Sequence, residues 1–178
     1  MPTTKELEIK AKIENFDTVR EKVAKLATFS ETHEFIDYYF ISEKIPETAE
    51  LRLRTQKNQK SVSLKTLISR NSVQENIEYR FNIDDAEAVV NLLEYLQFKL
   101  CAIIRKKSEV YNCEEILIQL VTTEKLGNYI ELALHTINDL TGPDREKMKR
   151  LASSLGIAHA TDSRYYSAIE KDKSSPTD

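Results

Sequence analysis

The residues best able to do chemistry are acids and bases that alternate with apolar residues along short segments. Near the start of the chain, single apolar residues separate Glu6, Glu8 and Lys10, and Arg52 and Arg54 have the same spacing in the run LRLR. Carboxylates hold divalent cations, whereas lysine and arginine donate hydrogen bonds to phosphate oxygens. Side chains of both kinds on one surface would suit a phosphate compound that carries its own metal ion.

The spacing of these residues indicates the elements that position them. A repeat of two residues is the period of a β-strand, whose successive side chains point to opposite faces. The run at 61–65 places Lys65 on one such face, and the run at 76–83 places Glu78 and Arg80 together on another. We expect about eight strands, at residues 6–13, 35–40, 51–54, 61–65, 76–83, 103–111, 115–121 and 129–134.

Helical periodicity occurs in other parts of the chain. Asn15 and either Asp84 or Asp85 are suitable N-cap residues before apolar stripes. A third helix has Pro143 in its first turn, where the missing N–H is harmless, and ends at Gly156. We expect helices at 16–26, 85–96 and 142–156, and a short fourth at 162–171.

Length and composition indicate one globular domain. The chain has 178 residues, of which 40% are hydrophobic and 31% are charged. Two domains of half this length would each have a small core. We expect a single domain at residues 1–171, loops at 42–50 and 69–76, and a disordered polar tail at 172–178.

Several classes of function are disfavoured. A formal net charge of −3 argues against a general nucleic-acid or anionic-membrane binder. No apolar run approaches the roughly 18 residues of a membrane span, and no secretory h-region is visible, so a cytoplasmic location is expected. Cys101 and Cys113 lack the spacing of a metal site or disulfide framework. His33, His135 and His159 are far apart in the sequence, and none is assigned to catalysis.

The charged strand faces can point either to water or to an enclosed interior. Many strands together with several amphipathic helices favour a sheet closed on itself, with helices covering its apolar outer face. Charges in such a lumen are tolerated only when acids, bases, water and a ligand neutralise one another. We therefore predict an α+β fold, a single-domain antiparallel eight-stranded β-barrel with helices packed outside. A polyphosphate with a divalent cation would fit its lumen.

The motifs occur in an order that resembles a known family. ExExK at 6–10 is followed by DYYF at 37–40, LRLR at 51–54, Lys65 within SVSLKT, and Glu78. Then come the basic cluster at 105–107, LGNYIEL with Glu131, and the closing segments LGI and DSRYYSAI. This order, over residues 4–170, resembles the CYTH superfamily of class IV adenylate cyclases and thiamine triphosphatases, also called triphosphate tunnel metalloenzymes.

The resemblance implies a role for each matching position. A divalent cation, Mg²⁺ or Mn²⁺, would be held by carboxylates, namely Glu6, Glu8 and Glu131. The triphosphate would be bound by cationic side chains, namely Lys10, Lys12, Arg52, Arg54, Lys65, Arg80 and Lys106, with Lys12 near the rim. Catalysis would involve Glu6, Lys10 and Glu78. A homodimer is also plausible from the family.

Two positions depart from the family pattern. Ser108 and Val121 stand where family members commonly have arginine and aspartate, and valine can neither bind metal nor position a nucleophile. Full activity would then require compensation from another residue, with Glu115, Gln119 and Glu124 as the candidates. Ala133 replaces a second glutamate found in many triphosphatases, a variation associated with the cyclase branch.

The resemblance leaves three functions open. The leading one is a class IV adenylate cyclase that converts ATP to cyclic AMP and pyrophosphate. The first alternative is a triphosphatase acting on thiamine triphosphate or inorganic triphosphate. The second is a catalytically impaired module that binds a nucleotide or polyphosphate. A P-loop mechanism is excluded because the chain has only three glycines and no GxxxxGKS motif.

Overall fold

The computed structural model describes residues 4–157 of the chain, and the description that follows concerns that part. Eight strands and three helices lie within it. The strands are β1 (Thr4–Ile13), β2 (Thr28–Ile41), β3 (Ala49–Gln56), β4 (Gln59–Arg70), β5 (Gln74–Asn82), β6 (Lys99–Cys113), β7 (Ile116–Thr123) and β8 (Gly127–Thr136). The helices are α1 (Phe16–Leu26), α2 (Ala86–Tyr95) and α3 (Gly142–Leu155).

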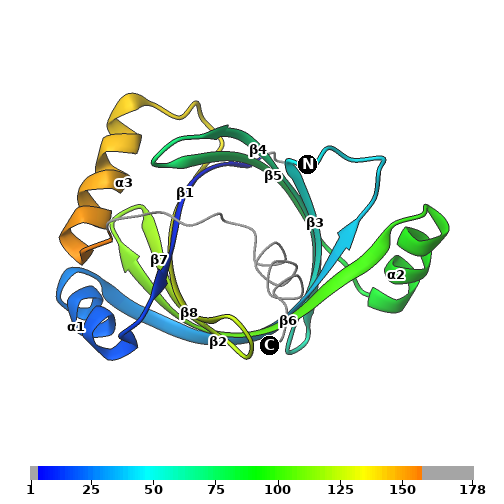
Figure 1. Cartoon of the computed structure of the whole chain (residues 1–178), viewed down its shortest axis with the longest axis horizontal. Coiled ribbons are helices and arrows are strands. Elements are labelled where there is room, and N and C mark those ends of the chain that lie inside the picture. The colour runs from blue at the N-terminus through cyan, green and yellow to red at the C-terminus, as the bar shows by residue number, and fades with distance from the viewer. Residues whose placement is uncertain (1–3, 158–178) are drawn as a thin grey trace, which may run out of the picture.

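The strands form one closed barrel with antiparallel neighbours, in the order β1-β5-β4-β3-β2-β6-β7-β8. Figure 1 looks down this ring, with α1 and α3 outside it on one side and α2 on the opposite side. Closure depends on β1, which pairs with β5 through its first residues and with β8 along most of its length. The predicted eight-stranded antiparallel barrel with external helices is confirmed.

The larger apolar core lies outside the barrel, between its wall and two helices. Leu7, Ile118 and Leu132 from β1, β7 and β8 pack with Val23 of α1 and Met148 of α3, and all five are fully buried. Burial of a side chain of this size is worth about 1.5–3 kcal/mol. The apolar face of each of these strands therefore points outward, so the opposite, charged face lines the lumen.

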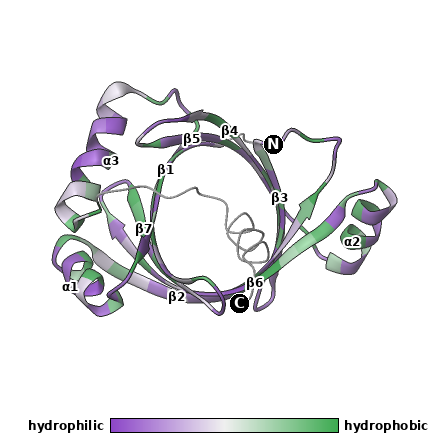
Figure 2. Cartoon of the chain, in the orientation of Figure 1, coloured by the Kyte–Doolittle hydropathy of each residue, from purple (hydrophilic) through white to green (hydrophobic). Residues whose placement is uncertain are grey.

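A second core covers the other side of the barrel. Phe40 of β2, Leu53 of β3 and Val62 of β4 are buried against Leu93 of α2. Figure 2 shows hydrophobic and hydrophilic segments alternating along the strands of the ring. Because the helices bury the apolar outer face of the sheet, its charged face can point inward.

The helix termini agree with the capping pattern of the sequence. The side chain of Asn15 accepts a hydrogen bond from the Thr18 N–H, and that of Asp85 accepts from the first turn of α2. Thr141 and Asp144 form a capping box at the start of α3. Gly156 ends α3 with a φ of 78°, a left-handed conformation that favours glycine.

Two sequence expectations are wrong in extent. The loop predicted at 69–76 is mostly strand, because β4 continues to Arg70 and pairs there with Gln74 of β5. The strands β2 and β6 are also much longer than 35–40 and 103–111, since each is paired with the other over most of its length. Cross-strand backbone hydrogen bonds stabilise these polar stretches, and the side-chain pattern does not reveal them.

Two other expectations, the helix at 162–171 and the tail at 172–178, lie outside the described residues. Within residues 4–157, none of the helices has the length and apolar character needed to cross a membrane.

Candidate active site

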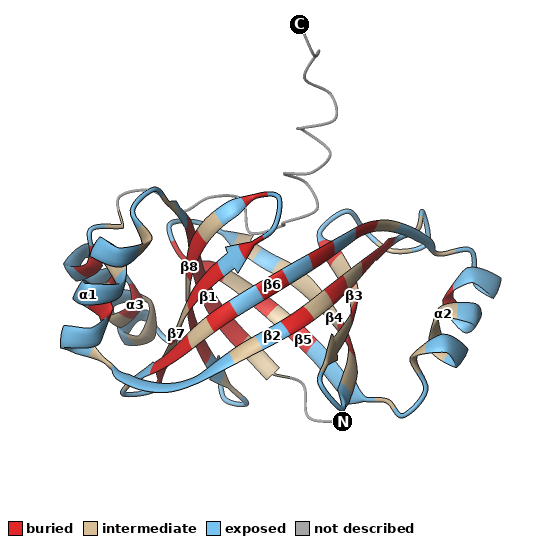
Figure 3. Ribbon diagram, turned by 90° about the horizontal axis from the view of Figure 1, so that it is seen from below, coloured by how far each residue is buried: buried red, intermediate tan, exposed pale blue. Residues whose placement is uncertain are grey.

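The register of the barrel places most of the charged positions on its inner face. Glu8 and Lys10 of β1 are only 4% and 7% exposed. Their strand pairs with β5 on one side and with β8 on the other, so both side chains lie within the closed sheet. Figure 3 shows buried residues alternating with intermediate ones along β2 and with exposed ones along β6. Buried charges of this kind require partners. The lumen provides them in two groups.

The first group, here called the acidic cluster, consists of Glu6, Glu8 and Glu131 with Lys10 and Lys65. The Lys10 Nζ lies 3.4 Å from carboxylate oxygens of both Glu8 and Glu131. The Lys65 Nζ lies 2.7 Å from Glu6 and 3.2 Å from Glu8. Three carboxylates from β1 and β8 therefore converge on two ammonium groups, which leaves one excess negative charge if all five are ionised.

Proton affinities within the acidic cluster differ although the acids share partners. Burial would raise the pKa of Glu8, but the Lys10 and Lys65 ammoniums overcome it and hold that pKa at about 2. Burial and the charge of Glu8 raise the pKa of Glu6 despite its contact with Lys65. Burial lowers the pKa of Lys10 and Lys65, but the adjacent carboxylates raise both above the ordinary value. Glu6 is therefore the carboxylate of the pair that takes up a proton first.

The second group, here called the basic cluster, has the opposite composition. Asp37 of β2 is completely buried and contacts three cations. Arg54 donates from Nε and Nη2 to its two oxygens at 2.7 and 2.9 Å, and the Lys106 Nζ lies 2.9 Å from the carboxylate in an ion pair. The Arg52 Nη1 lies 3.7 Å from the same carboxylate. The basic cluster therefore carries two excess positive charges.

The aromatic residues of β2 fix the cations further. The Tyr39 hydroxyl accepts a hydrogen bond from Lys106 at 2.9 Å and donates to Asp37 at 3.2 Å. The Arg54 guanidinium stacks over the Phe35 ring, 3.8 Å from its centroid. Burial lowers the pKa of Lys106 to about 8, even though Asp37 and Glu131 act in the opposite direction. Lys106 is thus the lumen cation that loses its proton most readily among those with a resolved shift.

The two clusters line the same cavity, whose open volume is only about 40 Å³. Glu78 of β5 connects them with the barrel mouth, because it lies 3.5 Å from Arg52 and 2.9 Å from Arg80. Two buried polar atoms in this region have no hydrogen-bond partner among the described residues, the Arg52 Nε and the Gln74 Oε1. The Arg52 Nε is a donor available to an anion, and the Gln74 Oε1 is an acceptor available to a cation.

The lumen wall formed by β6 and β7 is largely neutral. Ser108 is fully buried and donates only a long hydrogen bond, 3.4 Å, to Gln119. Val121, the cross-strand neighbour of Ser108, is 1% exposed and packs with Ile104 and Tyr129. Of the three residues expected to compensate, Gln119 alone faces the lumen, beside Glu131. Glu115 and Glu124 are exposed and pair with Lys147 and Arg105 on the outer surface.

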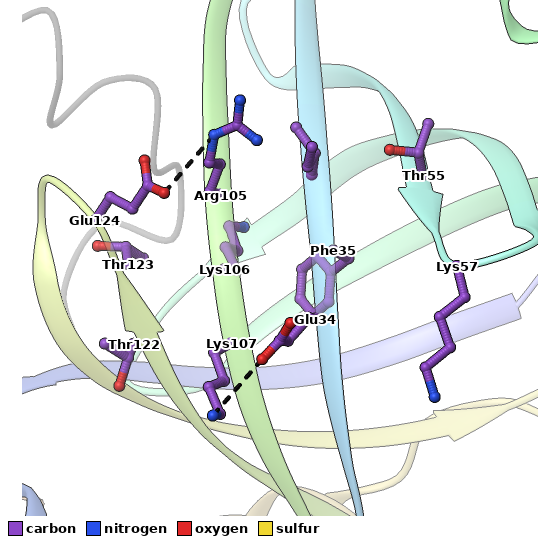
Figure 4. A pocket seen from close by; sticks show the side chains of 11 residues that line it. Glu34, Phe35, Thr55, Lys57, Arg105, Lys106, Lys107, Thr122, Thr123 and Glu124 are labelled. Atoms are coloured by element: carbon purple, nitrogen blue, oxygen red, sulfur yellow. Dashed lines mark ion pairs between the residues drawn. The ribbon is translucent and has the colours of Figure 1, made fainter.

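A larger hollow of about 490 Å³ adjoins the lumen along β2 and β6 (Figure 4), because Phe35 and Lys106 line both cavities. Glu34 pairs there with Lys107 at 3.6 Å, and Arg105 pairs with Glu124 at 3.7 Å. All four side chains are more than half exposed, so water screens them and their ion pairs contribute little. The charges of the smaller lumen cavity are buried, and we take the lumen as the candidate active site.

The structure brings together most of the positions expected from the sequence. Glu6, Glu8, Lys10, Arg52, Arg54, Lys65, Glu78, Lys106 and Glu131 all contact other members of the lumen groups. Arg80 contacts Glu78 but is 49% exposed, and Lys12 is exposed at the end of β1. These two lie at the rim of the site.

Asp37 is a charged lumen residue to which the sequence pattern assigned no role. It is the shared partner of all three cations of the basic cluster. Its position in the alternating run at 35–40, two residues before Tyr39, was the available signal. His135 also approaches the site, since its Nε2 is 3.8 Å from Glu6, although this histidine is 39% exposed.

The acidic cluster contains donor atoms that suit a divalent cation, but these atoms do not surround a common ion position. Carboxylate and amide oxygens are the donors that Mg²⁺ and Mn²⁺ prefer, and Glu6, Glu8, Glu131 and the unpartnered Gln74 Oε1 supply them. Within residues 4–157, however, no three acidic, histidine or cysteine side chains are arranged around a common ion position. Lys10 and Lys65 lie between the carboxylates instead. The donor set fits a divalent cation once these ammoniums move.

The fold and the lumen together define a class of protein, a closed barrel whose binding surface is its charged interior. A family model described as the CYTH domain matches residues 4–166. A Methanocaldococcus jannaschii protein named as a candidate adenylate cyclase is 32% identical over 161 residues, which cover 86% of this chain and 90% of that protein. The chain belongs to the CYTH family.

Solved structures with the same fold are also similar. A conserved hypothetical protein from Pyrococcus furiosus has a TM-score of 0.79 and 26% identity, covering 91% of this chain and 98% of that one. A Hippeastrum protein, described as a candidate adenylyl cyclase with a dominant triphosphatase activity, has a TM-score of 0.64 and 18% identity. That match covers 94% of this chain and 96% of the other and shows the fold alone.

Proposed function

We propose that this protein is a metal-dependent enzyme that processes a triphosphate in its lumen, with conversion of ATP to cyclic AMP and pyrophosphate as its reaction. The observation that carries the proposal is the convergence of an acidic and a basic cluster in one buried cavity. The name of the Methanocaldococcus jannaschii relative supports the cyclase reaction. Ala133, in the position of a glutamate found in many triphosphatases, points the same way.

The basic cluster would bind the phosphate chain. Arg52, Arg54 and Lys106 donate to phosphate oxygens and neutralise charge as it develops on the leaving pyrophosphate. Arg52 already has an Nε donor without a partner for such an oxygen. Lys10 and Lys65 would turn from carboxylates to phosphate, since an ammonium between two anions loses little by exchanging one of them for another.

The acidic cluster would hold Mg²⁺ or Mn²⁺ through Glu6, Glu8 and Glu131 once the ammoniums have moved. When bound, the divalent cation supplies charge neutralisation at the phosphate oxygens. In the cyclase reaction the ribose 3′-oxygen forms a bond to the α-phosphorus, and the bond from that phosphorus to the pyrophosphate oxygen breaks. Glu6 would accept the hydroxyl proton in the arrangement in which Glu8 and Glu131 hold the cation, since burial raises its pKa in the metal-free protein. Glu78 would keep Arg52 and Arg80 in place.

A triphosphatase is the second candidate, because none of the contacts described in the lumen selects a nucleoside over another triphosphate. The Hippeastrum protein of the same fold is named a cyclase and described with a dominant triphosphatase activity. The neutral wall at Ser108 and Val121 favours a third candidate, a binding module with little turnover.

One assay separates the three candidates. The purified protein is incubated with ATP, thiamine triphosphate or inorganic triphosphate in Mg²⁺ or Mn²⁺, and the products are resolved by chromatography. Cyclic AMP with pyrophosphate supports the cyclase, and orthophosphate supports the triphosphatase. Tight binding of a triphosphate without any product would refute both reactions and leave the binding module.

A further inference from the structure

We propose that Asp37 is a positioning residue, a counterion built into the lumen that holds Arg52, Arg54 and Lys106 in place for an incoming polyphosphate. This inference rests on the proposed function for its catalytic consequence. Three cations from two strands meet on this one carboxylate at 2.7–3.7 Å, and the carboxylate is inaccessible to solvent. The arrangement leaves the cations in excess, so neutralising them is not the whole of its role.

The contacts fix the orientation of two of the three cations, Arg54 and Lys106. Arg54 is held by two parallel hydrogen bonds, which set the plane of its guanidinium, and Phe35 packs against that plane. Lys106 is held by an ion pair with Asp37 and by a hydrogen bond to the Tyr39 hydroxyl. Side chains that are ordered before the ligand arrives do not have to be ordered by it.

The same carboxylate must also weaken the binding that it prepares. Its negative charge lies beside the cations and repels any anion that approaches them. Asp37 therefore has two effects of opposite sign on a polyphosphate, since it orients the donors and lowers their net attraction. If Asp37 only stabilised the fold, its substitution would reduce the amount of folded protein. The folded fraction would then bind polyphosphate with unchanged affinity and entropy.

The test compares two variants at this position. In Asp37→Asn the charge is lost and the cations are released, whereas in Asp37→Glu the charge is kept and the geometry is changed. Calorimetry with inorganic tripolyphosphate in metal-free buffer measures the affinity and the entropy of binding without turnover. Turnover of the triphosphate with Mg²⁺ or Mn²⁺ is measured separately on the same preparations.

We expect Asp37→Asn to bind tripolyphosphate several-fold more tightly than wild type but with a less favourable entropy, because the cations must now be ordered on binding. Its kcat should fall at least about tenfold. Asp37→Glu should retain the wild-type affinity within about twofold and still lose kcat. The control is Glu34→Gln, on the outer face of the same strand, which removes the same charge and should leave binding and turnover unchanged.

Three results would overturn the proposal. One is an Asp37→Asn protein that binds tripolyphosphate with unchanged or weaker affinity and unchanged entropy. Another is Asp37→Glu with wild-type kcat, which also decides the matter if Asp37→Asn does not fold. The third is a loss in both variants that matches the fraction of unfolded protein. A wild-type protein without turnover would refute the proposed reaction alone, and the binding affinities and entropies would still decide the role of Asp37.

Discussion

The acidic and basic clusters of the lumen are built on the same plan with the signs reversed. In the basic cluster one carboxylate, Asp37, lies among three cations, and in the acidic cluster two lysines lie among three carboxylates. Neither group is neutral, because the basic cluster has two excess positive charges and the acidic cluster has one excess negative charge. The residual charges have opposite signs and lie within one cavity.

This difference shows how a lumen can be stable when empty and still bind a charged ligand. Complete internal pairing would leave no affinity for a ligand, and unpaired charges would be too costly to bury. The partial pairing leaves two excess positive charges for phosphate and one excess negative charge for a cation. Substitutions that change one cluster should therefore affect one ligand and spare the other.

The largest effect is expected from Lys65→Met, which removes the ammonium shared by Glu6 and Glu8. Two adjacent buried carboxylates would then lose a partner, at a cost of about 3–5 kcal/mol in the free energy of unfolding. Thermal unfolding in metal-free buffer measures the loss, and millimolar Mn²⁺ should restore part of it. The exposed Lys107→Met is the control. Equal melting temperatures for both variants would refute the acidic cluster.

Arg54→Ala tests the basic cluster. Loss of a charged donor that is only partly exposed should raise KM for the triphosphate by about 10–100-fold. The metal concentration for half-maximal activity should not change, because within residues 4–157 the carboxylate that Arg54 contacts in the two clusters is Asp37 and none of the acidic cluster. Steady-state kinetics at varied triphosphate and metal concentrations measure KM and the half-maximal metal concentration separately. An equal change in these two quantities would contradict the division into clusters.

Glu8→Ala is the reciprocal experiment on the acidic side. It should raise the metal concentration for half-maximal activity by at least about tenfold, as loss of a metal ligand or of its neighbour does. The KM for a triphosphate at saturating metal should change less. Wild-type kinetics in both Glu8→Ala and Arg54→Ala would refute the lumen as the active site.

Binding should also depend on pH through Lys106, whose pKa is lowered to about 8. Below this pH the ammonium is charged and attracts the phosphate, and above it the charge is lost, so affinity falls by up to about tenfold per pH unit. A bound anion raises this pKa again, so binding above pH 8 takes up a proton. Calorimetry of tripolyphosphate binding between pH 7 and 9.5 measures both effects. Lys106→Met should flatten the profile, and an affinity that rises with pH would contradict the assignment.

The smallest effect is expected at the rim. Lys12 shares the strand face of Glu8 and Lys10 but is exposed at the end of β1. Lys12→Ala should therefore raise KM by less than about fivefold, the range of solvent-screened charges. Lys10→Ala, two residues further into the barrel, is the matched comparison. A loss in Lys12→Ala as large as in Lys10→Ala would place the phosphate chain nearer the mouth than the clusters indicate.

Much of this arrangement is determined by the local sequence. The period of two residues fixes which side chains share a strand face, so Glu6, Glu8 and Lys10 had to point the same way. Asn15, Asp85 and Gly156 likewise determine where helices begin and end. These features depend on neighbours a few residues away, whereas the inward orientation of the charged face follows from closure of the sheet.

The tertiary structure alone decided which charges meet. Glu8 and Lys65 are 57 residues apart, and their contact depends on closure of the barrel between β1 and β5. The register of β2 against β3 and β6 likewise makes Asp37 the common partner of Arg54 and Lys106. Alternation gives a side chain its face but not its cross-strand neighbour. That neighbour is set by backbone pairing between distant segments, because register is a property of the whole closed sheet.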